Sequence, residues 1–272
     1  MVQLSEIWIY PVKSLGGIKL QEAQVTDRGL EHDRRWLLVD ENAMFLSQRE
    51  HPELALFQPE ITGDFLKITH RVQLDTIQFP LQQSFSETET TIEVMVWEDS
   101  IQAYEVGSVI SDWFSQLLGF SARLVYMPEE SHRKVETKYA VTEADINSFS
   151  DGYPFLLIGQ SSLDDLNSRM KEALPMNRFR PNFVFTGGDA YEEDSWKEFT
   201  IGELTFFGVK PCGRCVMTTV DQEKGETSGK DPLLTLSKYR TVRNNVLFGQ
   251  NLIGSGTGFV TVGDAIAVLI SI

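Results

Sequence analysis

Short runs of aromatic and β-branched residues recur along this chain of 272 residues and constrain its fold more than any other feature. Such residues favour β-strands, and the Gly, Pro, Asp and Asn residues near the runs favour turns. The pattern therefore predicts a mainly β (α+β) protein built from short strands. The runs span residues 7–10, 35–39, 91–97, 182–185 and 203–209.

The last part of the chain predicts a β-hairpin, because Gly263 and Asp264 lie between two alternating apolar runs. Elsewhere strands and helices do not alternate regularly, and the sequence contains neither a G-x-G-x-x-G nor a Walker A motif. A Rossmann or flavodoxin-like fold is therefore disfavoured.

Three segments predict helices that pack on the β structure. The first carries an apolar stripe and ends at Gly119, a residue typical of helix C-termini. The second begins with Ser162 and Asp165, which resemble a capping box, and the third starts at Asp231 and continues to about residue 242. The stripe of the first helix consists of Val109, Ile110, Trp113, Phe114, Leu117 and Leu118.

The order of these segments predicts two packed lobes of β-barrel type with a few packing helices. A β-rich half extends to about residue 100, and a helix and a polar linking segment over residues 128–152 precede a second β-rich half. We expect the first lobe to span residues 1–125 and the second residues 126–272.

The formal net charge of −15 repels polyanions, so nucleic acid is disfavoured as a partner. A few cations gathered in one cleft can still attract a small anion. No apolar stretch is long enough for a membrane helix, and the first residues lack the pattern of a signal or transit peptide. We therefore expect a soluble, cytoplasmic protein without a membrane partner.

Cys212 and Cys215 are the only cysteines and lie in one C-x-x-C motif around Arg214. A structural zinc site needs four ligands, and a redox pair needs a following helix, whereas a strand-like sequence follows here. Two buried thiols are a third possibility, and one thiolate bound to a soft metal held by an organic cofactor is a fourth. The histidines that zinc would need lie upstream, at His32, His51, His70 and His132.

A phosphorylated cofactor would need cations and turn amides, and three segments offer them. Residues 10–17 end a strand in Lys13, a serine and two glycines, a composition that suits phosphate binding. Arg34 and Arg35 begin a strand, where alternation directs them to opposite faces. Two further candidates, Arg178 and Arg180, precede the strand at residues 182–185.

At these residues the sequence resembles the MOSC proteins that carry a preceding MOSC N-terminal β-barrel domain. This family includes the mitochondrial amidoxime-reducing component and its bacterial YcbX-like relatives. Ten markers with family-like spacing cover nearly the whole chain and are together far more specific than any one alone. In order they are YPVKS, DRRWLLVD, SQRE, FSDGYPFLLI, SLDDLNSRM, FRPNFVF, EDSWKEFTIGE, CGRCVMTTVD, KDPLLTLSKYR and LFGQN.

The resemblance implies a molybdenum cofactor, molybdopterin, with Cys215 supplying a further sulfur to the metal and Cys212 as its neighbour. It also assigns the two lobes as a MOSC N-terminal β-barrel domain and a MOSC domain. Asn251 stands where mitochondrial members have an aromatic residue. The positions implied to contact the cofactor are Lys13, Ser14, Arg34, Asp151, Gly152, Tyr153, Arg180, Asn182, Gly213, Arg214 and Asn251.

The activity implied by the resemblance is reduction, and so detoxification, of N-hydroxylated compounds such as amidoximes, hydroxylamines and N-hydroxylated bases. No cysteines remain for an iron–sulfur cluster, so electrons are expected from a separate flavoprotein reductase, ferredoxin or cytochrome. An alternative hypothesis is that the protein is a non-catalytic molybdopterin carrier or sulfur carrier. A third, pyridoxal phosphate binding, would need a Schiff-base lysine, for which Lys13 is the only motif candidate.

Overall fold

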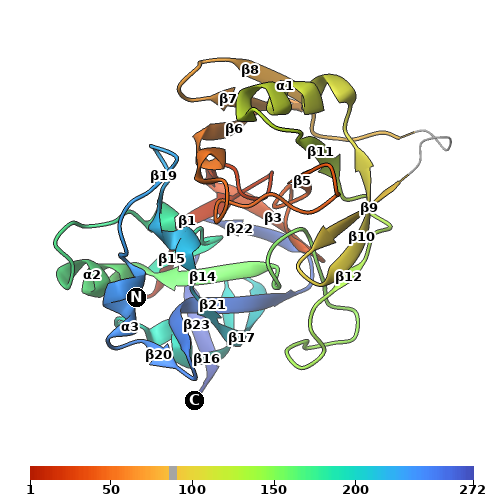
Figure 1. Cartoon of the computed structure of the whole chain (residues 1–272). Helices are drawn as coiled ribbons and strands as arrows, with labels where there is room; N and C mark the ends of the chain where they lie inside the picture. Colours follow the sequence, from red (N-terminus) through yellow and green to blue (C-terminus); the bar gives the residue numbers. More distant parts are fainter. Residues whose placement is uncertain (86–90) are drawn as a thin grey trace.

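A nine-stranded sheet forms the lower part of the molecule in Figure 1, in a computed structural model that describes residues 1–85 and 91–272. Its order is β2-β1-β15-β14-β21-β17-β16-β23, with β20 paired to β21. An isolated bridge between Gln3 and Ala265 joins β1 to the start of β23, so the sheet curves back on itself. The strands are β1 (Gln3–Ile9), β2 (Ile18–Leu20), β14 (Phe155–Gly159), β15 (Phe183–Thr186), β16 (Trp196–Ile201), β17 (Leu204–Gly213), β20 (Thr241–Val242), β21 (Asn245–Ser255) and β23 (Ile266–Ser271).

The first strand of the chain belongs to this sheet, far from its neighbours in sequence. β1 pairs antiparallel with β15, and Ile7 lies opposite Phe183. Aromatic side chains fill the interior: the rings of Phe155, Phe183 and Phe206 lie 5.4–5.5 Å apart. Such contacts bury large apolar areas, so strands from both ends of the sequence share one core.

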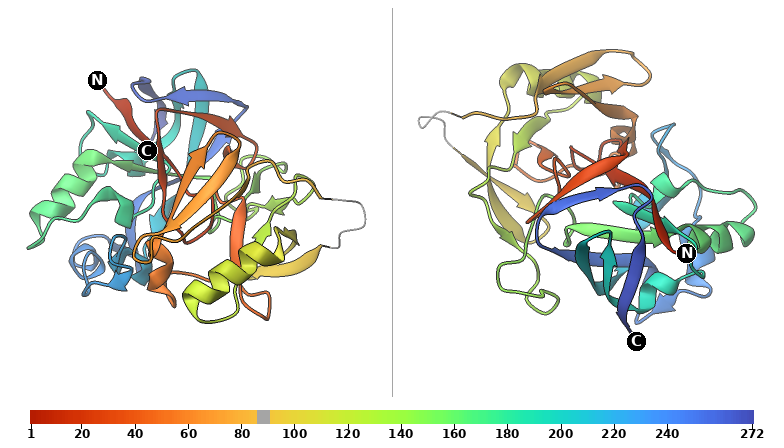
Figure 2. Two further views of the ribbon diagram at one scale, coloured as in Figure 1. Left: turned by 90° about the horizontal axis from the view of Figure 1, so that it is seen from above. Right: turned by 180° about the vertical axis from the view of Figure 1, so that it is seen from behind.

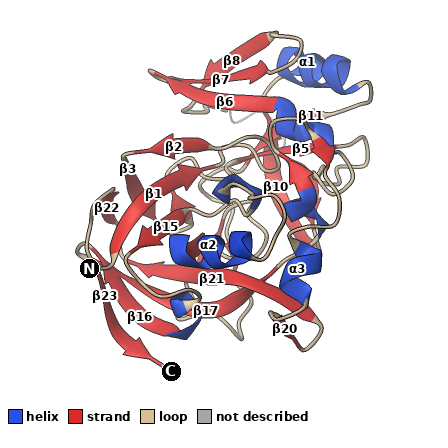
Figure 3. Ribbon diagram, turned by 90° about the vertical axis from the view of Figure 1, so that its left-hand side faces the viewer, coloured by secondary structure: helices blue, strands red, loops and turns tan. Residues whose placement is uncertain are grey.

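The upper part of the molecule contains two smaller sheets and a helix (Figure 3). One sheet has the order β5-β11-β10-β9 and the other the order β6-β7-β8. Helix α1 packs on the second sheet, since Phe114 and Trp113 contact Phe57. The elements are β5 (Trp36–Val39), β9 (Ile92–Val96), β10 (Asp99–Glu105), β11 (Arg123–Tyr126), β6 (Phe57–Thr62), β7 (Phe65–His70), β8 (Thr76–Pro80) and α1 (Ser108–Leu118).

Short elements connect these parts. A three-stranded sheet has the order β22-β3-β4, and two strand pairs, β12 with β13 and β18 with β19, lie in connecting segments. The strands are β3 (Glu22–Thr26), β4 (Gly29–Leu30), β12 (Arg133–Lys134), β13 (Ile146–Asn147), β18 (Val220–Asp221), β19 (Glu226–Thr227) and β22 (Gly258–Thr261). The 3-10 turns are η1 (Pro52–Leu56), η2 (Met176–Arg178), η3 (Glu192–Ser195) and η4 (Val216–Thr219). The predicted mainly β class is confirmed.

Helix α1 ends as predicted, with Gly119 in the left-handed region at φ 78°. Its buried side contains Ser111 and Phe114, but Val109 is 75% exposed, so its assignment to the buried stripe was wrong. At about 100° of rotation per residue, Val109 lies roughly 140° from Phe114 around the helix axis. That angle places Val109 outside the arc that faces the sheet.

Helix α2 (Gln160–Ser168) is shorter than the segment 161–174 that the sequence predicts as helical, and it begins differently. Gly159 is its N-cap, and no side-chain cap is formed, so the predicted capping box is wrong. Ser162 lies inside the helix, where its hydroxyl bonds the buried carboxylate of Glu193 at 2.9 Å. The helix connects β14 to its parallel neighbour β15, and Figure 2 shows it at the far side of the molecule from α1.

Helix α3 (Leu233–Ser237) is a single short turn rather than the long helix expected. The Asp231 carboxylate accepts hydrogen bonds from the amide and hydroxyl of Thr235, at 3.0 and 2.8 Å. The expected helical residues Thr241 and Val242 instead pair with β21 as β20. Within residues 1–85 and 91–272, no helix is long and apolar enough to cross a membrane.

The predicted terminal hairpin is wrong, because its two strands have different partners. β22 pairs with β3, whereas β23 pairs with β16. The bend between them is hydrogen-bonded to the N-terminal segment: Val262 donates to Gln21, and Gly263, at φ 103°, donates to Leu4. Hydrogen bonds to the N-terminal segment therefore replace those that a local hairpin would have formed.

Candidate functional site

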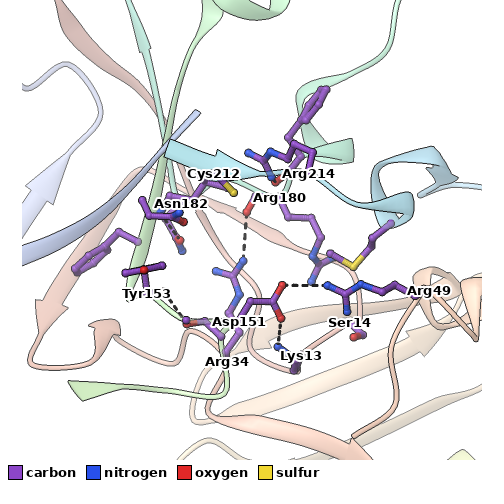
Figure 4. Close-up of a pocket in the computed structure, with 17 residues that line it drawn as sticks. Lys13, Ser14, Arg34, Arg49, Asp151, Tyr153, Arg180, Asn182, Cys212 and Arg214 are labelled. Carbon is purple, nitrogen blue, oxygen red and sulfur yellow. Dashed lines mark hydrogen bonds and ion pairs between the residues drawn. The ribbon is translucent and has the colours of Figure 1, made fainter. Parts of the chain in front are cut away.

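A pocket between the two parts of the molecule gathers most of the predicted site residues (Figure 4). Ten of the twelve predicted positions line it, which places segments from residue 13 to residue 251 around one space. Gly213 and Cys215 are not among the lining residues. The ten are Lys13, Ser14, Arg34, Asp151, Gly152, Tyr153, Arg180, Asn182, Arg214 and Asn251.

Lys13 is buried in the turn that follows β1. Its ammonium donates to the carbonyl of Phe149 at 2.8 Å. It also pairs with Asp151 at 2.6 Å, and Figure 4 shows this pair. Burial lowers the pKa of Lys13 to about 8, although Asp151 opposes this shift. An ammonium has three donors, so one remains for a bound ligand.

Asp151 is the only carboxylate that lines the pocket in the described residues. Burial favours its neutral form, but the charges of Lys13 and Arg49 outweigh burial and hold its pKa well below the usual range. It therefore stays ionised and partly compensates the cations around it.

Arg34 and Arg180 lie together over the ring of Tyr10, with guanidinium carbons 4.3 and 4.2 Å from its centre. Arg34 also pairs with the buried Asp33 at 2.6 Å, and burial lowers the pKa of Arg180 to about 10. Asp33 further accepts a bond from the Asn182 amide at 3.1 Å. Asp33 and Tyr10 thus hold the like charges of Arg34 and Arg180 close together. The sequence analysis did not predict a role for Asp33 or Tyr10.

Of the neighbouring residues Arg34 and Arg35, only Arg34 lies in the pocket. Arg34 lines the pocket, while Arg35 pairs with Glu129 at 2.8 Å on another side. Arg34 has φ 51°, so a left-handed backbone rather than strand alternation directs it there. Arg178, also a candidate, is buried against Asp221 at 3.3 Å and does not line the pocket.

Asn182, Ser14 and Tyr153 are held by protein contacts of their own. The Asn182 side chain accepts the amide of Leu156 at 3.2 Å, and the Ser14 hydroxyl donates to the carbonyl of Leu46 at 3.1 Å. The carbonyl of Tyr153 accepts the hydroxyl of Ser150 at 2.7 Å. These contacts fix the pocket walls before any ligand binds.

Cys215 does not line the pocket itself, but it contacts Arg49, which does. The Arg49 Nε donates to Cys215 Sγ at 3.2 Å, and the same guanidinium reaches Asp151 at 3.4 Å and lies 4.5 Å from the ring of Trp97. Arg49 lies within the SQRE marker, but its role was not predicted. The contact therefore places a positive charge beside the sulfur of Cys215.

Cys212 lines the pocket itself, near the end of β17. Burial raises the pKa of its thiol, with Arg214 opposing the shift. The two cysteines therefore have different surroundings: Cys212 is favoured as a neutral thiol, whereas Cys215 receives a bond from a cation.

Arg214 is positioned by two backbone carbonyls and keeps one donor free. Its Nε bonds the carbonyl of Phe248 at 2.8 Å, and its Nη1 bonds that of Phe179 at 3.0 Å. Its Nη2 is buried and has no hydrogen-bond partner among the described residues. A buried unpaired donor of a guanidinium is costly, so it indicates a place where a ligand acceptor would fit.

The pocket is cationic although the whole chain is strongly acidic. Five cations line it, namely Lys13, Arg34, Arg49, Arg180 and Arg214, against the single carboxylate of Asp151. This imbalance and the free Arg214 donor fit a phosphorylated anionic ligand. No group of three or more His, Cys, Asp or Glu side chains that could hold a metal by themselves occurs in the described part of the chain.

Two family models match this chain in the same order as its two parts. One is described as the MOSC N-terminal beta barrel domain and matches residues 1–121. The other is described as the MOSC domain and matches residues 144–267.

Similar proteins match over almost the full length. Mitochondrial amidoxime-reducing component 1 of Homo sapiens is 32% identical over 98% of this chain and 82% of its own length. Mitochondrial amidoxime reducing component 2 of Rattus norvegicus is 31% identical over 97% and 82%. Molybdenum cofactor sulfurase of Oryza sativa subsp. japonica is 32% identical over 91% of this chain but only 32% of that protein. The chain therefore belongs to the family of MOSC-domain proteins with an N-terminal MOSC β-barrel that includes the mitochondrial amidoxime-reducing components.

Proposed function

We propose that this chain is a molybdenum-dependent reductase of N-hydroxylated compounds, which include amidoximes, hydroxylamines and N-hydroxylated bases. The observation that carries the proposal is a cationic pocket in which one lining residue, Arg49, donates a hydrogen bond to the sulfur of Cys215. The names of its relatives support it, since they refer to amidoxime reduction and to the molybdenum cofactor. A flavoprotein reductase, ferredoxin or cytochrome would supply the electrons.

The residues present fit molybdopterin. Lys13, Arg34, Arg180 and the free donor of Arg214 would hold its phosphate and pterin, and Cys215 would donate its sulfur to the metal. When bound, this cofactor supplies a metal that exchanges two electrons with the N–O bond of the substrate. Because the proposed ligands lie on both sides of the predicted boundary at residue 125, both lobes would be needed to bind it.

Arg49 would orient the sulfur. Its guanidinium contacts Cys215, Asp151 and the ring of Trp97, so three partners restrict its position. The carboxylate of Asp151 would offset the repulsion between Lys13 and Arg49. The buried carboxylate of Asp33 compensates the charge of Arg34. The chain thus contributes positioning and charge to the reaction.

The pKa of Lys13 predicts how anion binding changes with pH. Because burial lowers that pKa to about 8, Lys13 is charged at pH 7 and mostly neutral at pH 9. We expect sulfate, whose charge is constant in this range, to bind the cofactor-free chain about tenfold more weakly at pH 9 than at pH 7. Titration calorimetry would measure this. The Lys13→Gln variant should bind weakly at both pH values, and a pH dependence that survives in it would contradict the assignment.

The relative named molybdenum cofactor sulfurase supports a second candidate, a carrier that binds molybdopterin or sulfur without turnover. One experiment separates the two. The chain is produced in a host that makes molybdopterin, its molybdenum is measured by elemental analysis, and an amidoxime is added with a chemical electron donor. Molybdenum with amidine formation supports the reductase, and molybdenum without amidine formation supports a molybdopterin carrier. Absence of molybdenum contradicts both of these and leaves only a sulfur carrier.

A further inference from the structure

The hairpin between β9 and β10 carries a tryptophan where glycine is usual. Val96 pairs with Asp99, so Trp97 and Glu98 alone form the turn, and Trp97 has φ 59°. A positive φ at the first residue of a two-residue turn favours glycine, because a bulky side chain is strained there. Trp97 is also 44% exposed. Strain of this kind persists only where other contacts hold the residue, and it is concentrated at functional sites.

Two contacts of Trp97 lead to the cationic pocket. Its ring centre lies 4.5 Å from the guanidinium carbon of Arg49, and its indole N–H donates to the Asp151 carboxylate at 3.3 Å. Arg49 and Asp151 both line the pocket, and their side chains are 3.4 Å apart, a contact that Figure 4 shows. Trp97 therefore contacts both members of this ion pair.

Phe45 adds a second ring to this arrangement. Its amide donates to the carbonyl of Met95 in β9 at 3.2 Å, and its ring centre lies 5.0 Å from that of Trp97. The Lys13 ammonium lies 5.5 Å from the centre of the Phe45 ring. Lys13 and Arg49, which pair with the same carboxylate, thus each lie over one of two contacting rings. Cation–π contacts favour this placement, so the two rings restrain both cations.

Arg49 transmits this restraint to Cys215. Its Nε donates to Cys215 Sγ at 3.2 Å, from the same guanidinium that contacts Trp97 and Asp151. A guanidinium is planar, so contacts that fix its plane also fix the direction of its Nε–H bond. Trp97 does not itself line the pocket, so its effect on the sulfur would pass through Arg49.

We propose that Trp97 is a positioning residue of this site, whose ring and N–H hold Arg49 and Asp151 so that the Arg49 Nε–H points at the sulfur of Cys215. The importance of that sulfur rests on the function proposed above, whereas the hold on Arg49 can be tested without it. Trp97→Phe keeps a ring over Arg49 and removes the donor to Asp151. Trp97→Ala removes both contacts.

A double-mutant cycle on the cofactor-free chain tests whether Trp97 acts through Arg49. Sulfate is the probe, and titration calorimetry measures its binding. We expect Arg49→Gln to weaken binding about tenfold, since a lining cation is lost, and Trp97→Ala to weaken it about threefold in the wild-type background. In the Arg49→Gln background, Trp97→Ala should have no further effect. An equal loss in both backgrounds, or no loss in either, would overturn the proposal.

Trp8→Ala is the matched control for this cycle. Trp8 also lies beneath a cation, with the Lys19 ammonium 5.8 Å from its ring centre, and its N–H donates to Glu6 at 2.7 Å. Trp8, Lys19 and Glu6 are not pocket-lining residues. We therefore expect sulfate to bind this variant as it binds the wild type, and thermal unfolding verifies that every variant is folded.

A glycine variant tests the strain in the turn. Trp97→Gly and Trp97→Ala lose the same contacts, but only glycine adopts a positive φ freely. We expect Trp97→Gly to unfold at the higher temperature, although glycine ordinarily destabilises a folded chain relative to alanine. The reverse order would show that the turn is not strained.

Turnover distinguishes positioning from contact with the substrate. In protein loaded with the cofactor, we expect Trp97→Phe to lower kcat for an amidoxime about threefold and to leave KM unchanged, because the indole contacts Arg49 and Asp151. A raised KM with an unchanged kcat would show that Trp97 contacts the substrate and would overturn the positioning role. If the protein binds no molybdenum or reduces no amidoxime, the proposed function fails, while the sulfate cycle still decides whether Trp97 holds Arg49.

Discussion

Replacement of Cys215 by serine is expected to reduce the molybdenum content of the purified protein from about one atom per chain to a small fraction of that, and to abolish reduction of amidoximes. A hydroxyl is a harder donor than a thiolate and is almost never ionised at neutral pH, so it binds a soft metal site poorly. Elemental analysis and pterin fluorescence would measure the loss in protein from a host that makes molybdopterin.

Cys212→Ser is the matched control. Burial raises the pKa of the Cys212 thiol, and that side chain receives no bond from Arg49. We therefore expect this variant to retain most of its molybdenum. Equal losses in the two variants would indicate that both cysteines bind the metal and would contradict the assignment to Cys215 alone.

The second large effect concerns the buried carboxylate of Glu193 in the turn η3. Its oxygens accept the hydroxyl of Ser162 at 2.9 Å, and one accepts the amide of Gly159 at 3.2 Å. Burial raises the pKa of Glu193 to about 7 in spite of these bonds. Because the folded pKa exceeds the unfolded one, the protein is most stable when Glu193 is protonated and loses stability as pH rises from about 4.5 through 7.

Glu193→Gln should therefore change the pH dependence of stability. The quantity to compare is the free energy of unfolding of the variant minus that of the wild type. We expect this difference to be about 3 kcal/mol more favourable to the variant at pH 8 than at pH 4.5. Urea denaturation at both pH values measures this. Glu203→Gln, at an exposed carboxylate, is the control and should follow the wild type throughout. Parallel curves for Glu193→Gln and wild type would show that Glu193 does not titrate as described.

Local patterns predicted the strands well but not their partners. The run at residues 203–209 is strand β17, and the run at 91–97 contains β9. The hairpin around Gly263 failed because Leu4 and Gln21 supply partners from the other end of the chain. Pairing between distant segments leaves no trace in the local alternation of apolar residues.

The candidate site was predicted best where residue chemistry is specific. Residue chemistry predicts Lys13 and one arginine of each pair, 34/35 and 178/180, as phosphate-binding cations, and the resemblance implies Arg34 and Arg180; these two and Lys13 line the pocket. Arg49 was not chosen, since its importance comes from contact with Cys215, which lies 166 residues away in sequence. The local sequence predicts Ser162 as part of a capping box, because nothing nearby in sequence reveals its actual partner, Glu193.

The pairing of β1 with β15 has a consequence for how the chain reaches its native state. The hydroxyl of Ser5 in β1 donates to the carbonyl of Val184 in β15, 179 residues later, so β1 is synthesised well before its partner strand. At ordinary translation rates of about 5–20 residues per second, β1 stays without its partner for roughly ten seconds or more. High contact order of this kind slows folding and leaves an apolar strand exposed to aggregation. We therefore expect a nascent chain ending near residue 125 to bind chaperones, because β1 still lacks its partner strand.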